Sequence, residues 1–214
     1  MSGDLIGKIA IYALPVIFAI TLHEAAHGYV ARRFGDMTAT LLGRVTLNPL
    51  KHIDWIGTVL VPVIALAVGG ILFGWAKPVP VNTAALRNPK KDMLWVAAAG
   101  PGANFAMALF WACVMRAGIE LDGSFFARPM VEMGVAGIGV NVVLAVLNLF
   151  PLPPLDGGRI AVSLLPGPLA WKFAQLERFG LVILVVLLVT GVLGTLLGPI
   201  VEFGINMVAS FVAP

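Results

Sequence analysis

Long apolar runs separated by short polar connections dominate the chain. Four stretches contain no Asp, Glu, Lys or Arg, and each is close to the roughly 20 residues that a helix needs to cross a bilayer. These stretches lie between Asp54 and Lys77, Asp92 and Arg116, Glu132 and Asp156, and Arg178 and Glu202. The pattern predicts an all-α polytopic membrane protein with about five to six membrane-embedded helices.

The first apolar run continues into a polar stretch, and we expect one helix over residues 5–34. Residues 37–50 lose the helical spacing. Within them the run 44–47 alternates between polar and apolar residues, and Asn48-Pro49 follows directly. Alternation that ends at turn residues is typical of a strand. We therefore expect a short β-hairpin after the first helix.

Composition extends the membrane assignment to the whole chain. Hydrophobic residues make up 59% of it and charged residues 12%, where soluble domains carry roughly 25% charged residues. Too little polar sequence remains for a separate soluble domain, so we expect one integral-membrane domain over residues 1–214. The net charge of +3 comes from basic residues between apolar runs, which favours anchoring at the membrane surface over binding to nucleic acid.

The stretch His23-Glu24-Ala25-Ala26-His27 fits the pattern H-E-x-x-H within the first helix. Residues four apart share a helix face, so both imidazoles can reach one metal ion, with Glu24 beside them as a candidate base. Most chance matches to this pattern bind nothing. Ionisable groups inside a membrane span cost at least roughly 2.5–3.5 kcal/mol each, however, and usually mark functional sites. The stretch therefore predicts a metal site.

A catalytic zinc ion needs a third protein ligand, because two histidines leave its coordination incomplete. Asp156 is the strongest candidate. It follows a proline-rich stretch that must interrupt a helix, and unwound backbone at membrane depth is tolerated only where protein or a water cavity surrounds it. A structural alternative stays open, in which Asp156 caps the helix that follows. Weaker candidates for the ligand are His52, Cys113, Glu132 and Glu202.

The order of the apolar runs constrains how this site can form. The histidines lie near the end of the first helix, and Asp156 lies at the end of the fourth run. If both intervening runs crossed the membrane, these ends would face opposite leaflets, whereas zinc–ligand distances are about 2 Å. We therefore expect residues 55–76 to be re-entrant and the two ligand-bearing helices to run parallel. The alternative places Asp156 deep within a longer, broken fourth segment.

Three motifs together resemble the site-2 protease family of intramembrane zinc metalloproteases. They are "HEAAH" in an early helix, "AGPGANF" in a middle one and "NLFPLPPLDGGR" in a later one. The last contains the family pattern N-x-x-P-x-x-x-L-D-G, matched by Asn148, Pro151, Leu155, Asp156 and Gly157. The stretch "GWAKPVPVN", residues 74–82, further resembles the compact prokaryotic branch of the family. The sequence shows no PDZ insert and no CBS pair.

The resemblance implies one zinc ion per chain, bound by His23, His27 and Asp156, with Glu24 as the catalytic base. It also implies hydrolysis of a peptide bond within or beside a transmembrane segment of a membrane-protein substrate. Asn104 and Asn148 are polar groups inside apolar runs. We consider both as donors to the developing oxyanion, with bonding between helices or support of the unwound stretch as the structural alternatives.

Two other classes of function remain to be weighed. A metal-ion or proton transporter would line a route with further ionisable groups, whereas those of this chain form one cluster. A non-catalytic membrane scaffold would have no need of Glu24 beside the metal. We therefore keep the expectation that the resemblance implies: a zinc metalloprotease of the prokaryotic plasma membrane whose partners are the lipid bilayer and a membrane-protein substrate. The substrate itself, the activating signal and the oligomeric state do not follow from the sequence.

Overall fold

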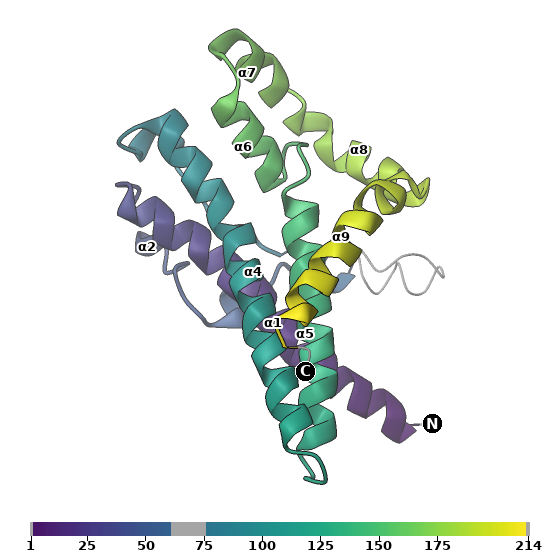
Figure 1. Ribbon diagram of the computed structural model, residues 1–214. Coiled ribbons are helices and arrows are strands. Elements are labelled where there is room, and N and C mark those ends of the chain that lie inside the picture. The colour runs from purple at the N-terminus through teal and green to yellow at the C-terminus, as the bar shows by residue number, and fades with distance from the viewer. Residues whose placement is uncertain (1, 61–75, 213–214) are drawn as a thin grey trace.

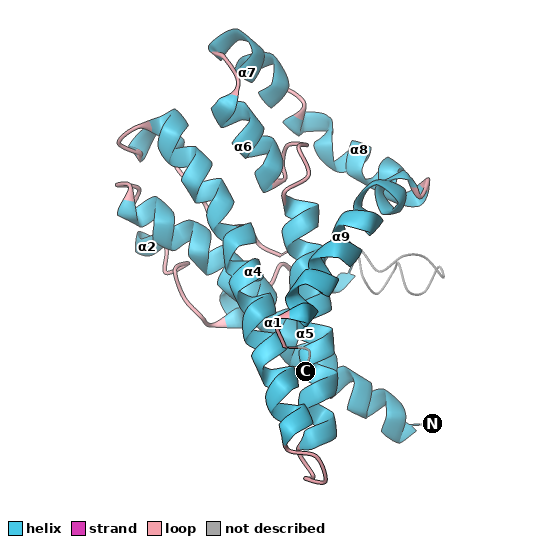
Figure 2. Ribbon diagram, viewed as in Figure 1, coloured by secondary structure: helices cyan, strands magenta, loops and turns pink. Residues whose placement is uncertain are grey.

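The computed structural model describes residues 2–60 and 76–212, and this part of the chain consists of helices and loops (Figures 1 and 2). The helices are α1 (Ser2–Arg33), α2 (Thr38–Leu41), α4 (Pro89–Glu120), α5 (Ala127–Asn148), α6 (Asp156–Leu164), α7 (Gly167–Ala174), α8 (Glu177–Val189) and α9 (Val192–Ser210). Three short helical turns complete the description: η1 (Pro49–Lys51), η2 (Trp55–Leu60) and η3 (Thr83–Ala85).

Prolines and glycines account for several of these boundaries. Helix α4 begins at Pro89, where the missing N–H would have no helical partner in any case. Helix α5 ends at Asn148, shortly before the first of three prolines. Gly191 has a φ of 76° and separates α8 from α9, because the left-handed region is open to glycine at little cost.

The hairpin of α4 and α5 forms the centre of the molecule, and α1 packs against both of its helices (Figure 1). Helix α9 covers α5, while α6 packs on α4. The core between α4, α5 and α9 includes the buried side chains of Trp111, Val142 and Val208. Gly137 lets α4 and α5 approach closely, because a Cβ atom there would lie 2.5 Å from Cδ1 of Trp111. Because lipid tails are as apolar as these side chains, close van der Waals packing and hydrogen bonds between helices, not the removal of water, stabilise this core within a bilayer.

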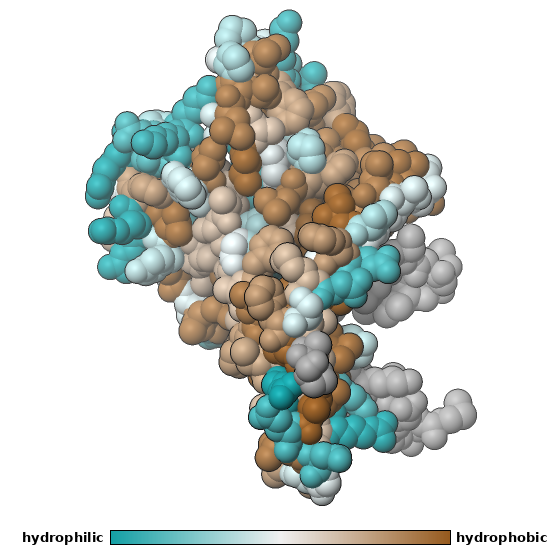
Figure 3. All heavy atoms as spheres, in the orientation of Figure 1, coloured by the Kyte–Doolittle hydropathy of each residue, from teal (hydrophilic) through white to brown (hydrophobic). Residues whose placement is uncertain are grey.

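Three helices in the described part of the chain, α4, α5 and α9, are long and apolar enough to cross a membrane. Figure 3 shows polar residues gathered at the end where α1 finishes and α4 begins, and again at the loop between α4 and α5, with apolar residues between them. Helix α4 has 32 residues and is therefore about 48 Å long, which exceeds the roughly 30 Å of hydrocarbon. Its two ends can reach the headgroup regions.

The expected β-hairpin after the first helix is wrong. Residues 37–50 form α2, η1 and irregular backbone, and no strand occurs in the part of the chain that is described. Side chains hold this backbone instead of a partner strand: His52 Nε2 lies 3.0 Å from the Thr46 carbonyl oxygen, and the Asn48 side chain accepts a hydrogen bond from the Leu50 N–H at 3.0 Å. Alternation within residues 44–47 was not sufficient to form a strand, because strand formation depends on the neighbours that the tertiary structure supplies.

The expected number of five to six membrane-embedded helices is also wrong, since three helices of the described residues satisfy the length and composition of a span. The apolar run 179–197 contributes to the difference because Gly191 divides it. Helix α8 has 13 residues and is therefore about 20 Å long, which is too short to cross the hydrocarbon. The re-entrant turn expected in 55–76 falls on residues 61–75, outside the described residues.

Candidate metal centre

Three buried side chains from distant parts of the sequence converge on one point: His23 and His27 of α1 and Asp156, the first residue of α6. The two Nε2 atoms are 3.1 Å apart, and Asp156 Oδ2 lies 3.2 Å from His23 Nε2 and 3.3 Å from His27 Nε2. Ligands placed about 2.0 Å from a tetrahedral zinc ion are themselves about 3.3 Å apart. The triangle therefore has the dimensions of one face of a zinc coordination tetrahedron.

The hydrogen bonds of the other ring nitrogens leave both Nε2 atoms free of protons. His27 Nδ1 lies 2.7 Å from the Val96 carbonyl oxygen, which can only accept, so the neutral ring carries its proton on Nδ1. His23 Nδ1 lies 2.6 Å from Asn104 Oδ1. Donation from Nδ1 to an oxygen orients a metal-binding imidazole and raises its basicity at Nε2. Both rings thus direct a lone pair toward Asp156.

Asn104 has no exposed surface, and all of its amide atoms are engaged. Its Nδ2 donates to the Ala19 carbonyl oxygen at 3.2 Å and to Asn141 Oδ1 at 3.0 Å. These two acceptors fix the amide orientation, so that Oδ1 must accept from His23 Nδ1. Asn141 in turn donates to the Gly137 carbonyl oxygen at 2.8 Å. In this arrangement Asn104 has no N–H to spare for a substrate, and its contacts are those of a residue that orients His23.

Asn148, the other candidate donor to an oxyanion, lies at the last position of α5 and is partly buried. Its Nδ2 donates to the Leu144 carbonyl oxygen at 3.0 Å. One amide hydrogen remains for a further contact. A role in stabilising an oxyanion stays a prediction for this residue.

The site fits a cation in two independent respects. Asp156 Oδ2 is buried, has no hydrogen-bond partner among the described residues and lies beside two imidazole lone pairs, an arrangement of three electron-rich atoms that a positive ion stabilises. Gly100 of α4 faces the same point, because a Cβ atom there would lie 2.6 Å from His23 Nε2 and would also collide with His27 Nε2. A glycine therefore keeps the space between the histidines open.

Glu24 lies on α1 next to the first histidine and is partly buried. Its Oε2 accepts a hydrogen bond of 2.7 Å from the backbone N–H of Val79. Val79 belongs to an irregular stretch that precedes α4. The carboxylate is thus oriented by a segment 55 residues away in sequence.

Asp156 reaches the histidines because of how the chain leaves α5. Helices α1 and α5 both run away from the end of the molecule that holds the N-terminus and the α4–α5 loop (Figure 1). The prolines after α5 end the helix, and the chain turns so that α6 packs against α4. Gly157 and Gly158 lie against the backbone of residues 149–153, where no side chain could fit. This tight turn places the carboxylate at the histidines.

Sequence reasoning missed the roles of Gly100, Asn141 and Val79. Nothing in the local sequence distinguishes Gly100 from Gly102, two residues later, although a Cβ atom on Gly102 would have nothing within 4 Å. Asn141 is seven residues before Asn148, and this spacing places both on one helix face but does not reveal the contact of Asn141 with Asn104. No local signal could identify Val79, because its N–H matters only through its contact with α1.

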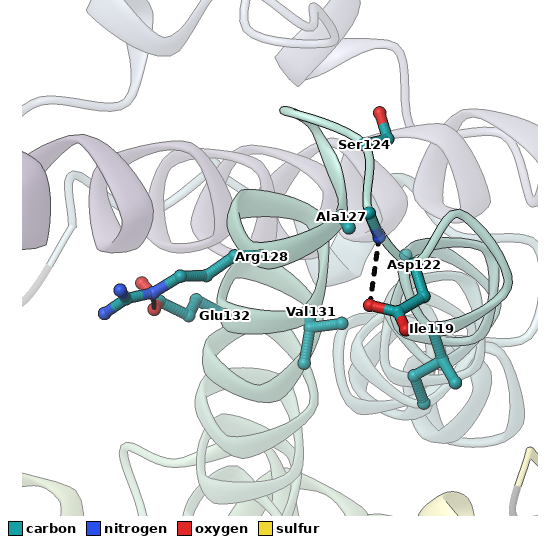
Figure 4. Close-up of a pocket in the computed structure, with 9 residues that line it drawn as sticks. Ile119, Asp122, Ser124, Ala127, Arg128, Val131 and Glu132 are labelled. Atoms are coloured by element: carbon teal, nitrogen blue, oxygen red, sulfur yellow. Dashed lines mark hydrogen bonds and ion pairs between the residues drawn. The ribbon is translucent and has the colours of Figure 1, made fainter.

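A hollow of about 580 Å³ lies at the opposite end of α4, at the α4–α5 loop. Figure 4 shows that its charged groups bond to their neighbours: Arg128 pairs with Glu132 at 2.6 Å, and Asp122 accepts a hydrogen bond from the Gly123 N–H. Gly118, in its lining, is 18 residues from Gly100 along α4, a distance of about 27 Å. This hollow is separate from the metal centre.

Two groups of known proteins are similar to the chain over most of its length. It is 40% identical over 195 residues to "Putative zinc metalloprotease YwhC" of Bacillus subtilis, a match that covers 89% of the chain and 85% of the relative. It is 34% identical over 176 residues to "Putative zinc metalloprotease Rip2" of Mycolicibacterium smegmatis and 30% identical over 172 residues to the protein of the same name in Mycobacterium tuberculosis. The chain spans 64% and 63% of the length of these two relatives. No family model and no solved structure matches the chain.

The fold and the site define a helical membrane protein with a histidine–histidine–aspartate centre suited to a metal ion. The relatives narrow this class. The chain belongs to the site-2 protease family of intramembrane zinc metalloproteases, as the resemblance of its motifs indicated.

Proposed function

We propose that the protein is an intramembrane zinc metalloendopeptidase that holds one zinc ion through His23, His27 and Asp156 and uses Glu24 as its general base. The observation that carries the proposal is the triangle of three buried atoms with free lone pairs, 3.1–3.3 Å apart, with no donor between them among the described residues. Catalytic zinc sites have three protein ligands and one open position. Three ligands within the described residues match that requirement.

A zinc ion bound there supplies a Lewis acid that polarises the scissile carbonyl and makes water a stronger acid. Glu24 removes one proton from the attacking water, whose oxygen forms the new bond to the carbonyl carbon. As the C–N bond breaks, Glu24 returns that proton to the leaving nitrogen, so the glutamate ends the cycle as it began. Asn104 keeps His23, and the Val96 carbonyl oxygen keeps His27, in the tautomer that can bind the metal.

The depth of the site supports a substrate that is itself in the membrane. Gly100 faces the histidines and is 11 residues from the start of α4, which corresponds to about 16 Å along a helix suited to span the bilayer. We assign the substrate class as membrane proteins whose transmembrane segment reaches this depth in unwound form. The bacterial relatives support the plasma membrane as the location.

The transporter and scaffold alternatives have less support. A transporter needs ionisable groups along a route, whereas the group of candidate metal ligands found in the described residues is the trio of His23, His27 and Asp156. A scaffold needs no base, whereas Glu24 is held in place by a hydrogen bond of 2.7 Å.

The test compares purified wild type with Glu24→Gln, Asp156→Ala and the control Asp122→Ala, which changes a carboxylate in the distant α4–α5 loop. Zinc is measured by elemental analysis, and cleavage is measured on a fusion protein that contains a single transmembrane segment. We expect about one zinc ion per chain in all but Asp156→Ala, and cleavage in wild type and Asp122→Ala alone. Zinc retained by Asp156→Ala would refute the ligand assignment. Cleavage by Glu24→Gln at the rate of wild type would refute the role of the base.

A further inference from the structure

Residues 76–82, which we call the strap, cross α1 beside the metal centre without forming a helix. Side chains and backbone of the segment after α1 hold the strap at both ends. Arg44 Nη2 donates to the Lys77 carbonyl oxygen at 2.8 Å and to that of Pro78 at 3.4 Å, and the Asn82 N–H donates to Asp36 Oδ2 at 2.7 Å. Arg44 and Asp36 are both buried. The strap is therefore fixed to the segment that follows α1 by two buried charged side chains.

The sequence of the strap leaves one backbone donor at its centre. Pro78 and Pro80 have no N–H, so Val79 is the one residue of this tripeptide that has a backbone donor. Its N–H donates to Glu24 Oε2 at 2.7 Å. Each proline also fixes its own φ and restricts the residue before it to extended conformations. The N–H of Val79 is thus presented from a stiff stretch of backbone.

Packing holds the strap close to the same turn of α1. The Val79 side chain is 5% exposed. Gly28, one residue after the second histidine, lies beneath it: a Cβ atom on Gly28 would lie 3.2 Å from Val79 Cγ1 and 2.8 Å from Val45 Cγ2. The glycine permits the close approach that brings the N–H of Val79 within reach of Glu24.

We propose that the strap is a positioning element for catalysis, in which the Val79 N–H orients the Glu24 carboxylate and Arg44 holds the strap in place. This inference rests on the proposed function, because it assumes that Glu24 is the base. With Oε2 bound to Val79, Oε1 is the oxygen left to accept the proton of the attacking water. Glutamate has several rotatable bonds, and holding it in one orientation favours the geometry of proton transfer. Arg44 acts through the strap.

The decisive variant is Val79→Pro, which removes the N–H and keeps an apolar side chain. Val81→Pro is the matched control, because no hydrogen bond joins its N–H to a described residue. A hydrogen bond to a charged group corresponds to roughly a tenfold to hundredfold effect on rate. We expect kcat on the transmembrane-segment fusion to fall by that factor in Val79→Pro alone, with KM and zinc content unchanged. Equal kcat in Val79→Pro and Val81→Pro would overturn the inference.

Arg44 provides a second test that does not depend on proline. Arg44→Ala should lower kcat with zinc content unchanged, and Arg44→Lys should restore part of the loss because one ammonium nitrogen can donate to both carbonyl groups. A fall in Arg44→Ala that Arg44→Lys does not reduce would show that the residue acts only on folding, against the inference. A double-mutant cycle tests the same contact. In the Glu24→Asp background the carboxylate is already displaced from Val79, so adding Val79→Pro should lower kcat by much less than it does in wild type.

Hydrogen exchange tests the contact without any substrate. In Glu24→Ala the Val79 amide loses its acceptor and should exchange faster than in wild type, and the two flanking prolines contribute no amide signal to the same peptide. Unchanged exchange would refute the contact.

The outcomes also separate the inference from the proposed function. If wild type cleaves, Glu24→Gln does not, and Val79→Pro equals its control, the strap inference fails and the function stands. If wild type and Glu24→Gln behave alike, the function fails and the inference with it.

Discussion

The substitution Gly100→Ala tests the metal centre by adding a single methyl group. The new Cβ atom would lie 2.4 Å from His27 Nε2 and 2.6 Å from both Cε1 and Nε2 of His23, whereas nonbonded heavy atoms prefer about 3.5 Å or more. The imidazole of His23 must therefore move by about 0.9 Å and that of His27 by about 1.1 Å, whereas metal–ligand distances are held within about 0.2 Å. Loss of a residue that only hydrogen-bonds to a metal ligand lowers metal affinity by about tenfold to hundredfold. Because Gly100→Ala displaces the ligands themselves, we expect the affinity for zinc to fall by at least about hundredfold.

Gly102→Ala is the matched control, because this residue lies on the same helix and a Cβ atom there has nothing within 4 Å. Alanine is a better helix former than glycine by about 1 kcal/mol, so neither variant should weaken α4 itself. Zinc is measured by elemental analysis after dialysis against a series of chelator concentrations, and Tm is measured alongside. The reasoning is refuted if Gly100→Ala binds zinc as tightly as Gly102→Ala, or if both variants lose zinc equally.

Three further predictions concern the supporting residues and the metal itself. Asn104→Ala should lower zinc affinity by about tenfold to hundredfold because His23 loses its orienting partner, measured by chelator competition; an affinity equal to that of wild type would contradict this role. Burial raises the pKa of Asp36, but hydrogen bonds from Thr38 and from the Asn82 N–H outweigh it and leave that pKa below its ordinary value of 3.8. Asp36 therefore stabilises the fold at neutral pH, and Asp36→Asn should lower Tm there, with the difference shrinking only as the pH falls below 3.8; a difference that stays constant from neutral pH to well below that value would exclude the linkage. Removing zinc with a chelator should abolish cleavage and adding zinc should restore it, unless the protein unfolds irreversibly, which the Tm of the metal-free protein would reveal.

The local spacing of residues was enough to predict the three candidate metal ligands from the sequence. Four residues separate His23 from His27, and the helical repeat alone places them on one face. The prolines before Asp156 and the glycines after it indicated an interrupted helix without any knowledge of its neighbours. Apolar runs predicted a helical membrane protein, and the relatives confirm the family that the motifs indicated. Each of these inferences depends on patterns within short stretches of the chain and on their order, and none requires knowledge of which stretches are in contact.

Only the tertiary structure shows the contacts between stretches that are far apart in the sequence. Asn104 orients His23, Gly100 leaves room beside the histidines, and Val79 orients Glu24, each across more than 50 residues of sequence. The missing β-hairpin has the same cause: whether residues 44–47 form a strand depends on a partner edge, and the structure brings the strap to Arg44 in place of a strand. A sequence specifies which groups are present and their local repeat, but the packing of helices decides which of those groups meet.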